Sequence, residues 1–176
     1  MVGWTDLPAD LSDHAQIARL QAHLPEDALV VSSDLQRCTA TAKALADGRE
    51  MLPAEADLRE IHFGEWEMKP FDDLARSDPE RARAFWSNPG DTAPPGGESW
   101  NQVATRIGGV VDRLNRSHEG RDIIAVAHFG AILTQVQMAG GMTARSALSF
   151  KIDNLSVTRL DFLDPAWRIG GVNHLP

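Results

Sequence analysis

The chain has 176 residues, which fits one domain, and its apolar content of 43% is enough for a buried core and argues against disorder. The net charge of −8 disfavours nucleic acid and anionic membranes as partners. The chain has a single cysteine, Cys38, so it cannot form an intrachain disulfide. It has no apolar run long enough to span a membrane and no signal peptide at the start. We therefore expect a cytoplasmic protein.

The first third of the chain alternates helix, strand and helix. Apolar residues recur at helical spacing over residues 10–24, and the apolar run at 28–31 predicts a buried strand. Ser33 followed by Gln36 matches a capping box, which predicts a second helix over residues 34–46.

The middle of the chain has a different composition. Residues 52–58 are compatible with a short strand, and beyond them aromatic residues mix with prolines. Residues 71–87 predict a short helical insertion, followed by a loop at 88–99 that is rich in Pro and Gly. We therefore expect one domain over residues 1–176, with a small helical cap inserted at about 60–98.

The last part returns to alternating helices and strands. We expect a helix from Ser99, a strand at 121–127, a helix at 131–140, and strands at 154–162 and 167–172. This order predicts an α/β fold, a three-layer α/β/α arrangement whose mainly parallel sheet carries helices on both faces. In such sheets, ligands bind beyond the carboxyl ends of the strands.

Two strand-to-helix corners carry polar groups. The first, VVSSDLQRC, offers Ser33, free N–H groups at a helix start and Arg37, which together suit an anion such as phosphate. The second, IIAVAHFGA, ends a buried strand on His128. Taken separately, each also has a structural explanation, namely a capped helix with a solvent-facing arginine and a core histidine.

A third candidate is LREIHFGEWE, residues 58–67. Glu60 stands beside bulky aromatic residues, and such a carboxyl can have a raised pKa and serve as a general acid. The alternative is a surface glutamate beside a hydrophobic plug, and His62 is a rival proton donor of lower weight. The six histidines include no pair at i, i+4 and no His-x-His, so we expect no metal site and no cofactor.

Five motifs together resemble a known family. GWTDLP, SSDLQRCTATA, LREIHFGEWE, PGGES and VAHFG have the order and spacing of the histidine phosphatase superfamily, also called the phosphoglycerate mutase-like family. The resemblance runs from Gly3 to the C-terminus and is nearest to the α-ribazole phosphatases of cobalamin biosynthesis. It implies a phosphatase, a hydrolase of phosphoric monoesters, that acts on a phosphorylated small molecule through a phosphohistidine.

The resemblance also implies roles position by position. Arg37 matches the arginine that grips the phosphate, and Glu60 matches the acid/base carboxylate. His128 matches the second histidine, which binds the transferring phosphoryl group. Ser33 and Ser99 match motif positions with supporting roles in substrate binding.

The chain departs from the family pattern in two places. Phe129 stands where the family usually has Gly, so its side chain is expected to narrow the pocket or shift the backbone N–H groups. The larger departure is the absence of Arg-His-Gly, which should precede GWTDLP and supplies the nucleophile. Neither His14 nor His23 can replace it, because neither follows a buried strand.

We therefore expect that the family's first strand is absent from this chain, which is then inactive or impaired. A start set downstream of the true one is the favoured explanation, ahead of a natural pseudoenzyme and a deliberate cut. Neighbouring strands would be left with unpaired backbone groups, at ~1–3 kcal/mol for each one buried. We expect a repair by a shifted strand, an exchanged segment or a homodimer across the gap.

Other functions stay open from the sequence. The main competitor is a phosphate- or phosphopeptide-binding pseudoenzyme that uses Arg37 and His128 without turnover. A phosphoglycerate mutase is a further alternative, although the short chain favours a phosphatase. A serine hydrolase has little support, because GGESW is followed by Asn101 and comes after a Pro-rich loop rather than a strand.

Overall fold

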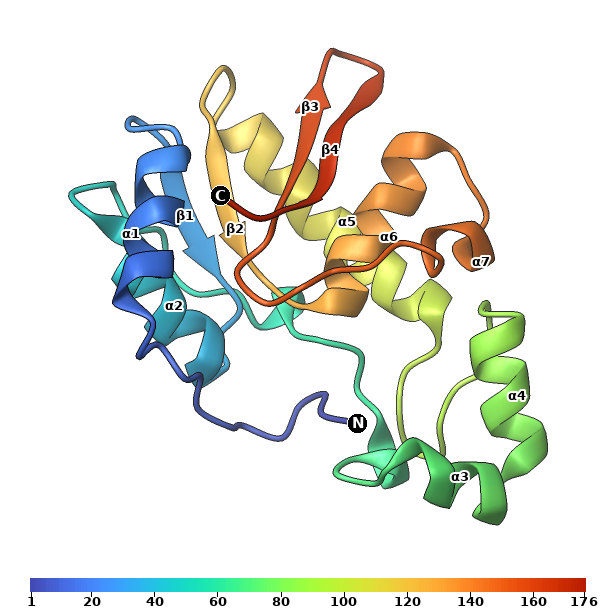
Figure 1. The fold of residues 1–176 in the computed structure, drawn as a ribbon. Coiled ribbons are helices and arrows are strands. Elements are labelled where there is room, and N and C mark those ends of the chain that lie inside the picture. The colour runs from blue at the N-terminus through green and yellow to red at the C-terminus, as the bar shows by residue number, and fades with distance from the viewer.

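Helices and strands alternate along the whole chain in the computed structural model, which describes all 176 residues. The helices are α1 (His14–His23), α2 (Gln36–Ala46), α3 (Phe71–Ser77), α4 (Pro79–Ser87), α5 (Trp100–Ser117), α6 (Phe129–Gly140) and α7 (Ala144–Ala147). The strands are β1 (Leu29–Ser32), β2 (Ile123–Val126), β3 (Val157–Phe162) and β4 (Trp167–His174), and the 3₁₀ turns are η1 (Ala56–Leu58) and η2 (Gly64–Trp66). The α/β class expected from the sequence is confirmed (Figure 1).

A small parallel sheet lies at the centre of the fold. β1 pairs in parallel with β2, and Leu29 is the partner of Ile123. Every residue of β1 is buried, which explains its unbroken apolar run. Both strands run toward the same edge, and the chain leaves that edge into α2 and α6.

Helices cover both faces of this sheet (Figure 1). Ile124 and Val126 pack with the apolar residues of α1 and α2. Val31 and Ile123 point the other way and join the main core, to which α5 and α6 contribute. Successive residues of a strand face opposite sides, so the two neighbouring isoleucines of β2 serve the two different faces.

The other two strands form a separate antiparallel pair, β3 with β4. β2 pairs only with β1 and β3 pairs only with β4, so each of these two strands has one unpaired edge. No strand of this chain has shifted to join the two sheets. Of the repairs expected from the sequence, the exchanged segment and the homodimer stay predictions.

Helices α3 and α4 form the lower lobe in Figure 1, as expected for the helical insertion. Their buried residues Leu74, Ala82 and Phe85 belong to the same core cluster as Trp100 of α5. The lobe is therefore joined to the rest of the molecule by a continuous apolar core. The boundaries of a cap at about 60–98 stay a prediction.

Two local expectations are wrong. The segment 52–58 forms no strand: this part of the chain makes only two isolated bridges, Met51 with Val30 and Glu55 with Ser33, before the turn η1. Pro53 lies between those bridges and has no N–H, so it cannot extend the ladder.

The second wrong expectation is the capping box at Ser33 and Gln36, which does not form. The Gln36 N–H donates to the Asp6 side chain at 2.7 Å, and the Ser33 hydroxyl accepts from the Leu35 N–H at 3.3 Å. A side chain 30 residues earlier therefore caps α2. The helix begins at Gln36 rather than Asp34.

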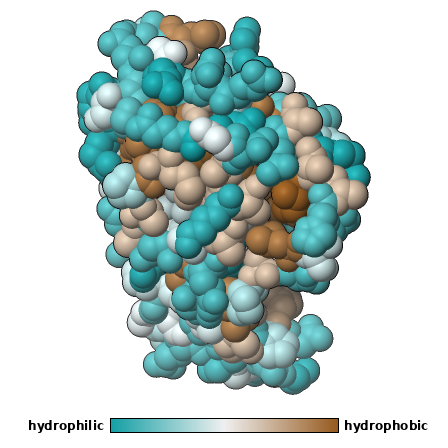
Figure 2. Space-filling view, turned by 90° about the vertical axis from the view of Figure 1, so that its left-hand side faces the viewer, coloured by the Kyte–Doolittle hydropathy of each residue, from teal (hydrophilic) through white to brown (hydrophobic).

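The face that carries α1 and α2 is mixed in character. Figure 2 shows weakly and strongly hydrophobic residues through its middle, broken up by hydrophilic side chains. No helix of the structure combines the length and the apolar character needed to cross a bilayer.

Candidate active site

Arg37 and His128 meet at the edge of the sheet where β1 and β2 end. Arg37 lies in the first turn of α2, and His128 is the N-cap residue of α6. The Arg37 Nε donates to the His128 Nδ1 at 3.2 Å. A guanidinium can only donate, so Nδ1 is the acceptor and the proton of the neutral imidazole is on Nε2.

Arg37 is also bound by the N-terminal segment. Its Nη1 donates to the Thr5 carbonyl at 2.9 Å and its Nη2 to the Gly3 carbonyl at 2.6 Å. Glu67 holds that segment from the other side by accepting the N–H groups of Gly3, Trp4 and Thr5. Burial opposes the ionised form of Glu67, but these donors hold its pKa below its ordinary value.

Glu60 lies between η1 and η2 and points its carboxyl group at the start of α6. The Gly130 N–H donates to it at 3.0 Å, and the Ile61 N–H donates at 2.8 Å. The residue is only 6% exposed, and burial raises the pKa of Glu60, although the two N–H groups and then Arg37 and Arg106 oppose the rise. A carboxyl in this setting can keep a proton to donate.

Gly130 is required by the close approach of Glu60. A Cβ built on Gly130 would lie 2.4 Å from the Glu60 Oε1, well inside van der Waals contact. Gly130 is two residues after His128, so its N–H places the Glu60 carboxyl group at the corner that also holds Arg37. The three residues that the sequence singled out as phosphate ligands and acid are therefore neighbours in space.

His128 is buried and electrically neutral at ordinary pH. Burial lowers its pKa to about 3, and the positive charges of Arg37 and Arg106 add to the effect. The Cys38 Sγ lies 3.4 Å from the His128 Nε2. Burial raises the pKa of this thiol to about 12, so it stays protonated.

The supporting residues expected from the sequence take structural positions. Ser33 is fully buried behind the corner, and Ser99 caps α5 through a reciprocal pair of hydrogen bonds with Gln102. Phe129 is 39% exposed beside His128, and the N–H of the next residue still reaches Glu60. The His62 ring packs edge-on against Trp4, at 4.6 Å between ring centroids.

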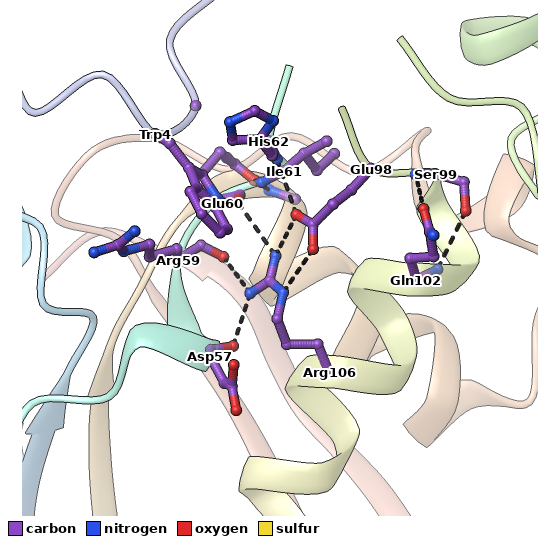
Figure 3. A network of polar contacts seen from close by, with 12 residues as sticks. Trp4, Asp57, Arg59, Glu60, Ile61, His62, Glu98, Ser99, Gln102 and Arg106 are labelled. Carbon is purple, nitrogen blue, oxygen red and sulfur yellow. Dashed lines mark hydrogen bonds and ion pairs between the residues drawn. The ribbon is translucent and has the colours of Figure 1, made fainter. Parts of the chain in front are cut away.

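A second polar network, centred on Arg106 of α5, lies behind Glu60 (Figure 3). Arg106 forms an ion pair with Glu98 and donates to backbone carbonyls of the segment that carries Glu60. The residues of the structure include no group of three His, Cys, Asp or Glu side chains placed to hold a metal ion.

Comparison with known proteins decides the family. The sequence profile of the histidine phosphatase superfamily (branch 1) matches residues 1–174. The chain belongs to this superfamily. It is 28% identical over 151 residues to the adenosylcobalamin/α-ribazole phosphatase of Escherichia coli K12, with 85% of this chain and 74% of that protein covered. It is 33% identical over 152 residues to phosphoglycerate mutase-like protein 4 of Arabidopsis thaliana, with 83% and 65% covered.

Solved structures of similar proteins share the fold of this histidine phosphatase. YhfR of Bacillus stearothermophilus has a TM-score of 0.88 and 25% identity, covering 100% of this chain and 89% of that one. The mycobacterial glucosyl-3-phosphoglycerate phosphatase Rv2419c has a TM-score of 0.84 and 27% identity, with 99% and 90% covered. The resemblance inferred from five short motifs is therefore confirmed at the level of the family and the fold.

Several residues around the site of this histidine phosphatase were not found from the sequence. Asp6 and Glu67 each bind backbone groups more than 25 residues away, and Arg106 does the same across the site. Asp6 in GWTDLP and Glu67 in GEWE belong to no local sequence pattern that would indicate a hydrogen bond to a distant backbone group. For Arg106, the sequence offered one signal. This charged residue directly precedes Ile107, a buried residue on the apolar face of the predicted helix.

Proposed function

We propose that this histidine phosphatase hydrolyses phosphomonoesters of small molecules, with Arg37 and His128 holding the phosphoryl group and Glu60 moving the protons. The observation that carries the proposal is the meeting of a guanidinium, an imidazole and a buried carboxyl group at one corner of the sheet. Arg37 makes three hydrogen bonds within the protein, one each from Nε, Nη1 and Nη2. A guanidinium has five N–H donors, so one remains on each terminal nitrogen for phosphate oxygens.

The proposed reaction has two steps. An imidazole nitrogen bonds to phosphorus while the ester P–O bond breaks, and protonated Glu60 gives its proton to the leaving alkoxide. The Glu60 carboxylate then takes a proton from water, whose oxygen attacks phosphorus as the P–N bond breaks and phosphate leaves. The raised pKa of Glu60 supports the first step, since a carboxyl group must hold a proton before it can donate one.

The attacking imidazole is the part of this mechanism that the 176 residues do not supply. They contain no Arg-His-Gly triplet, and the Nδ1 of His128 already accepts from Arg37. We therefore propose that this chain by itself binds phosphate and turns substrates over poorly or not at all.

We propose α-ribazole-5'-phosphate as the substrate, on the strength of the similarity to the adenosylcobalamin/α-ribazole phosphatase of Escherichia coli. A relative that acts as a glucosyl-3-phosphoglycerate phosphatase gives the competing candidate. Release of inorganic phosphate from these two esters and from 3-phosphoglycerate ranks the three, measured side by side with a protein extended at its N-terminus by a relative's first strand that ends in Arg-His-Gly. A preference for either glycerate ester would contradict the ribazole assignment.

The activity itself is tested with p-nitrophenyl phosphate. We expect almost no hydrolysis by the 176-residue chain and clear hydrolysis when a relative's first strand, ending in Arg-His-Gly, is fused before Met1. In parallel, calorimetry with inorganic phosphate is expected to show binding that R37A weakens at least tenfold. Full activity of the unextended chain would contradict the missing nucleophile.

The second candidate function is phosphate binding without catalysis. It is favoured by Arg37, which keeps one free N–H on each terminal nitrogen beside His128 and can therefore bind phosphate without any chemical step. If the fused protein binds phosphate but stays as inactive as the chain by itself, the binding module is the better description.

A further inference from the structure

Arg106 and Glu98 form an ion pair behind the candidate active site. The Nε and Nη2 of Arg106 donate to the two oxygens of Glu98 at 2.9 and 2.8 Å, which is a bidentate geometry. The two side chains are only 13% and 20% exposed. Burying such a pair costs solvation free energy, and an apolar pair of similar volume is often as stable. Stability is therefore a weak reason for its presence.

The remaining donors of Arg106 all reach one short segment. Nη1 donates to the carbonyls of Asp57 at 2.8 Å and Arg59 at 3.0 Å, and Nη2 donates to the carbonyl of Glu60 at 3.3 Å. With the two bonds to Glu98, all five N–H groups of the guanidinium have an acceptor. Figure 3 shows Arg106 reaching from α5 into this segment.

Glu98 binds the backbone on the other side of Glu60, at His62. Its Oε2 accepts the His62 N–H at 3.0 Å, and its own N–H donates to the His62 carbonyl at 2.8 Å. The ion pair therefore holds the backbone on both sides of Glu60 and Ile61. The indole N–H of Trp4 adds a bond to the Glu60 carbonyl at 2.8 Å.

The side chain of Glu60 has little else to orient it. Its carboxyl group is held only by the N–H groups of Gly130 and Ile61. The Glu60 backbone must therefore stay in register with the start of α6 for the Gly130 contact to persist. A displacement of 1 Å at this point would open a hydrogen bond that is now 3.0 Å long.

We propose that Arg106 is a positioning residue, whose planar guanidinium, fixed by Glu98, holds the segment 57–60 so that the Glu60 carboxyl group stays against Gly130 at the phosphoryl site. The inference rests on the proposed function only in giving Glu60 the acid/base role. A single lysine could not do the same, because an ammonium group has three donors on one atom and cannot span five acceptors.

The test uses NMR titration, which needs no turnover. Gly130 is followed by its amide resonance and Glu60 by its ¹³C-labelled carboxyl group. In the unmodified chain, the Gly130 amide is expected to shift as Glu60 titrates, because the two are hydrogen-bonded. The other groups that act on Glu60 are Arg37 of α2 and the Cys38 thiol, and neither residue is substituted in any variant.

The decisive variant replaces both partners, R106M/E98M, so that no unpaired charge is left buried. We expect the Gly130 shift that follows Glu60 to fall below half its normal amplitude. The matched control is R113M/E55M, which removes the ion pair between Arg113 of the same helix and Glu55, a pair whose arginine side chain is 50% exposed. That control is expected to keep the full amplitude.

R106K separates positioning from charge, since it keeps the charge but loses the planar group. We expect it to recover the Gly130 shift only in part. An unchanged shift in R106M/E98M, or full recovery in R106K, would overturn the proposal. A phosphatase assay that fails in every form of the protein would refute the proposed function and leave this result standing.

Discussion

Arg37 connects three parts of the chain through one side chain. It donates to the ring of His128 and to the carbonyls of Gly3 and Thr5. The first bond sets the tautomer of His128: Nδ1 accepts, so the ring proton is on Nε2, which lies 3.4 Å from the Cys38 Sγ. Burial, and after it the charge of Arg37, lowers the pKa of His128 and keeps it neutral, so the corner carries the positive charge on the guanidinium rather than on the imidazole.

The neutral state of His128 makes a prediction about stability and pH. Its pKa is about 3 in the folded protein and 6.5 in the unfolded chain. Between these values, the unfolded chain binds a proton that the folded chain does not. The free energy of unfolding therefore falls as pH falls below 6.5, by up to ~1.4 kcal/mol per pH unit from this residue.

The variant H128Q tests this, because Gln can still accept from Arg37 and does not titrate. From pH 7 to pH 5, we expect the unmodified chain to lose ~2 kcal/mol more of its free energy of unfolding than H128Q loses. Urea unfolding at the two pH values measures the difference. Parallel pH profiles for the two proteins would contradict a buried neutral histidine.

Among the elements, α5 is determined both by its local sequence and by its tertiary contacts. Its N-terminus has a complete capping box: the Ser99 hydroxyl accepts from the Gln102 N–H at 3.3 Å, and the Gln102 side chain accepts from the Ser99 N–H at 2.8 Å. Its buried residues recur at three- and four-residue spacing, as an amphipathic helix requires. The cap fixes the start of the helix that carries Arg106.

Removing this cap is expected to destabilise the protein. S99A leaves the Gln102 N–H without its acceptor, at a cost of ~1 kcal/mol in the free energy of unfolding. Urea denaturation measures it, with S117A at the exposed far end of the same helix as the control. S117A is expected to stay within ~0.5 kcal/mol of the unmodified chain. If the two variants behaved alike, the cap would contribute nothing.

At the scale of the whole molecule, the N-terminal segment joins the sheet to the α3–α4 lobe. Glu67, close to that lobe, accepts N–H groups from Gly3, Trp4 and Thr5. The carbonyls of the same segment accept from Arg37 of α2. The segment therefore links Arg37 of α2 to the region of the insertion, although it has no regular secondary structure.

The variant E67Q is expected to loosen this link. Its amide has one oxygen in place of two and adds donors that face the N–H groups of the segment. We expect hydrogen exchange of the Trp4 amide to become about tenfold faster, while exchange within α5 stays unchanged. E65Q, an exposed acid in the same turn, is the control. Equal exchange of Trp4 in E67Q and E65Q would contradict the role of Glu67.

The sequence by itself determined the family and the α/β class, and it predicted Arg37, Glu60 and His128 as residues of one site. The family followed from the resemblance of five motifs in order, and that resemblance also implied the roles of the three residues. The α/β class could be predicted because buried strands and amphipathic helices are local patterns whose periodicity follows directly from backbone geometry. Ser33 with Gln36 matched such a pattern equally well, yet Asp6 supplies the cap of α2. The segment at 52–58 was similarly ambiguous between strand and loop. Pro53 has no N–H to donate, so it cannot extend the ladder there.

Only the tertiary structure decided which polar groups complete the site. Glu67, Arg106 and Glu98 act through backbone carbonyls and N–H groups of distant segments, and every residue type carries those groups. The sequence therefore does not show which backbone groups these side chains bind. The raised pKa of Glu60 was anticipated from its aromatic neighbours in the sequence, whereas the lowered pKa of His128 follows from its burial and became visible only in the folded chain.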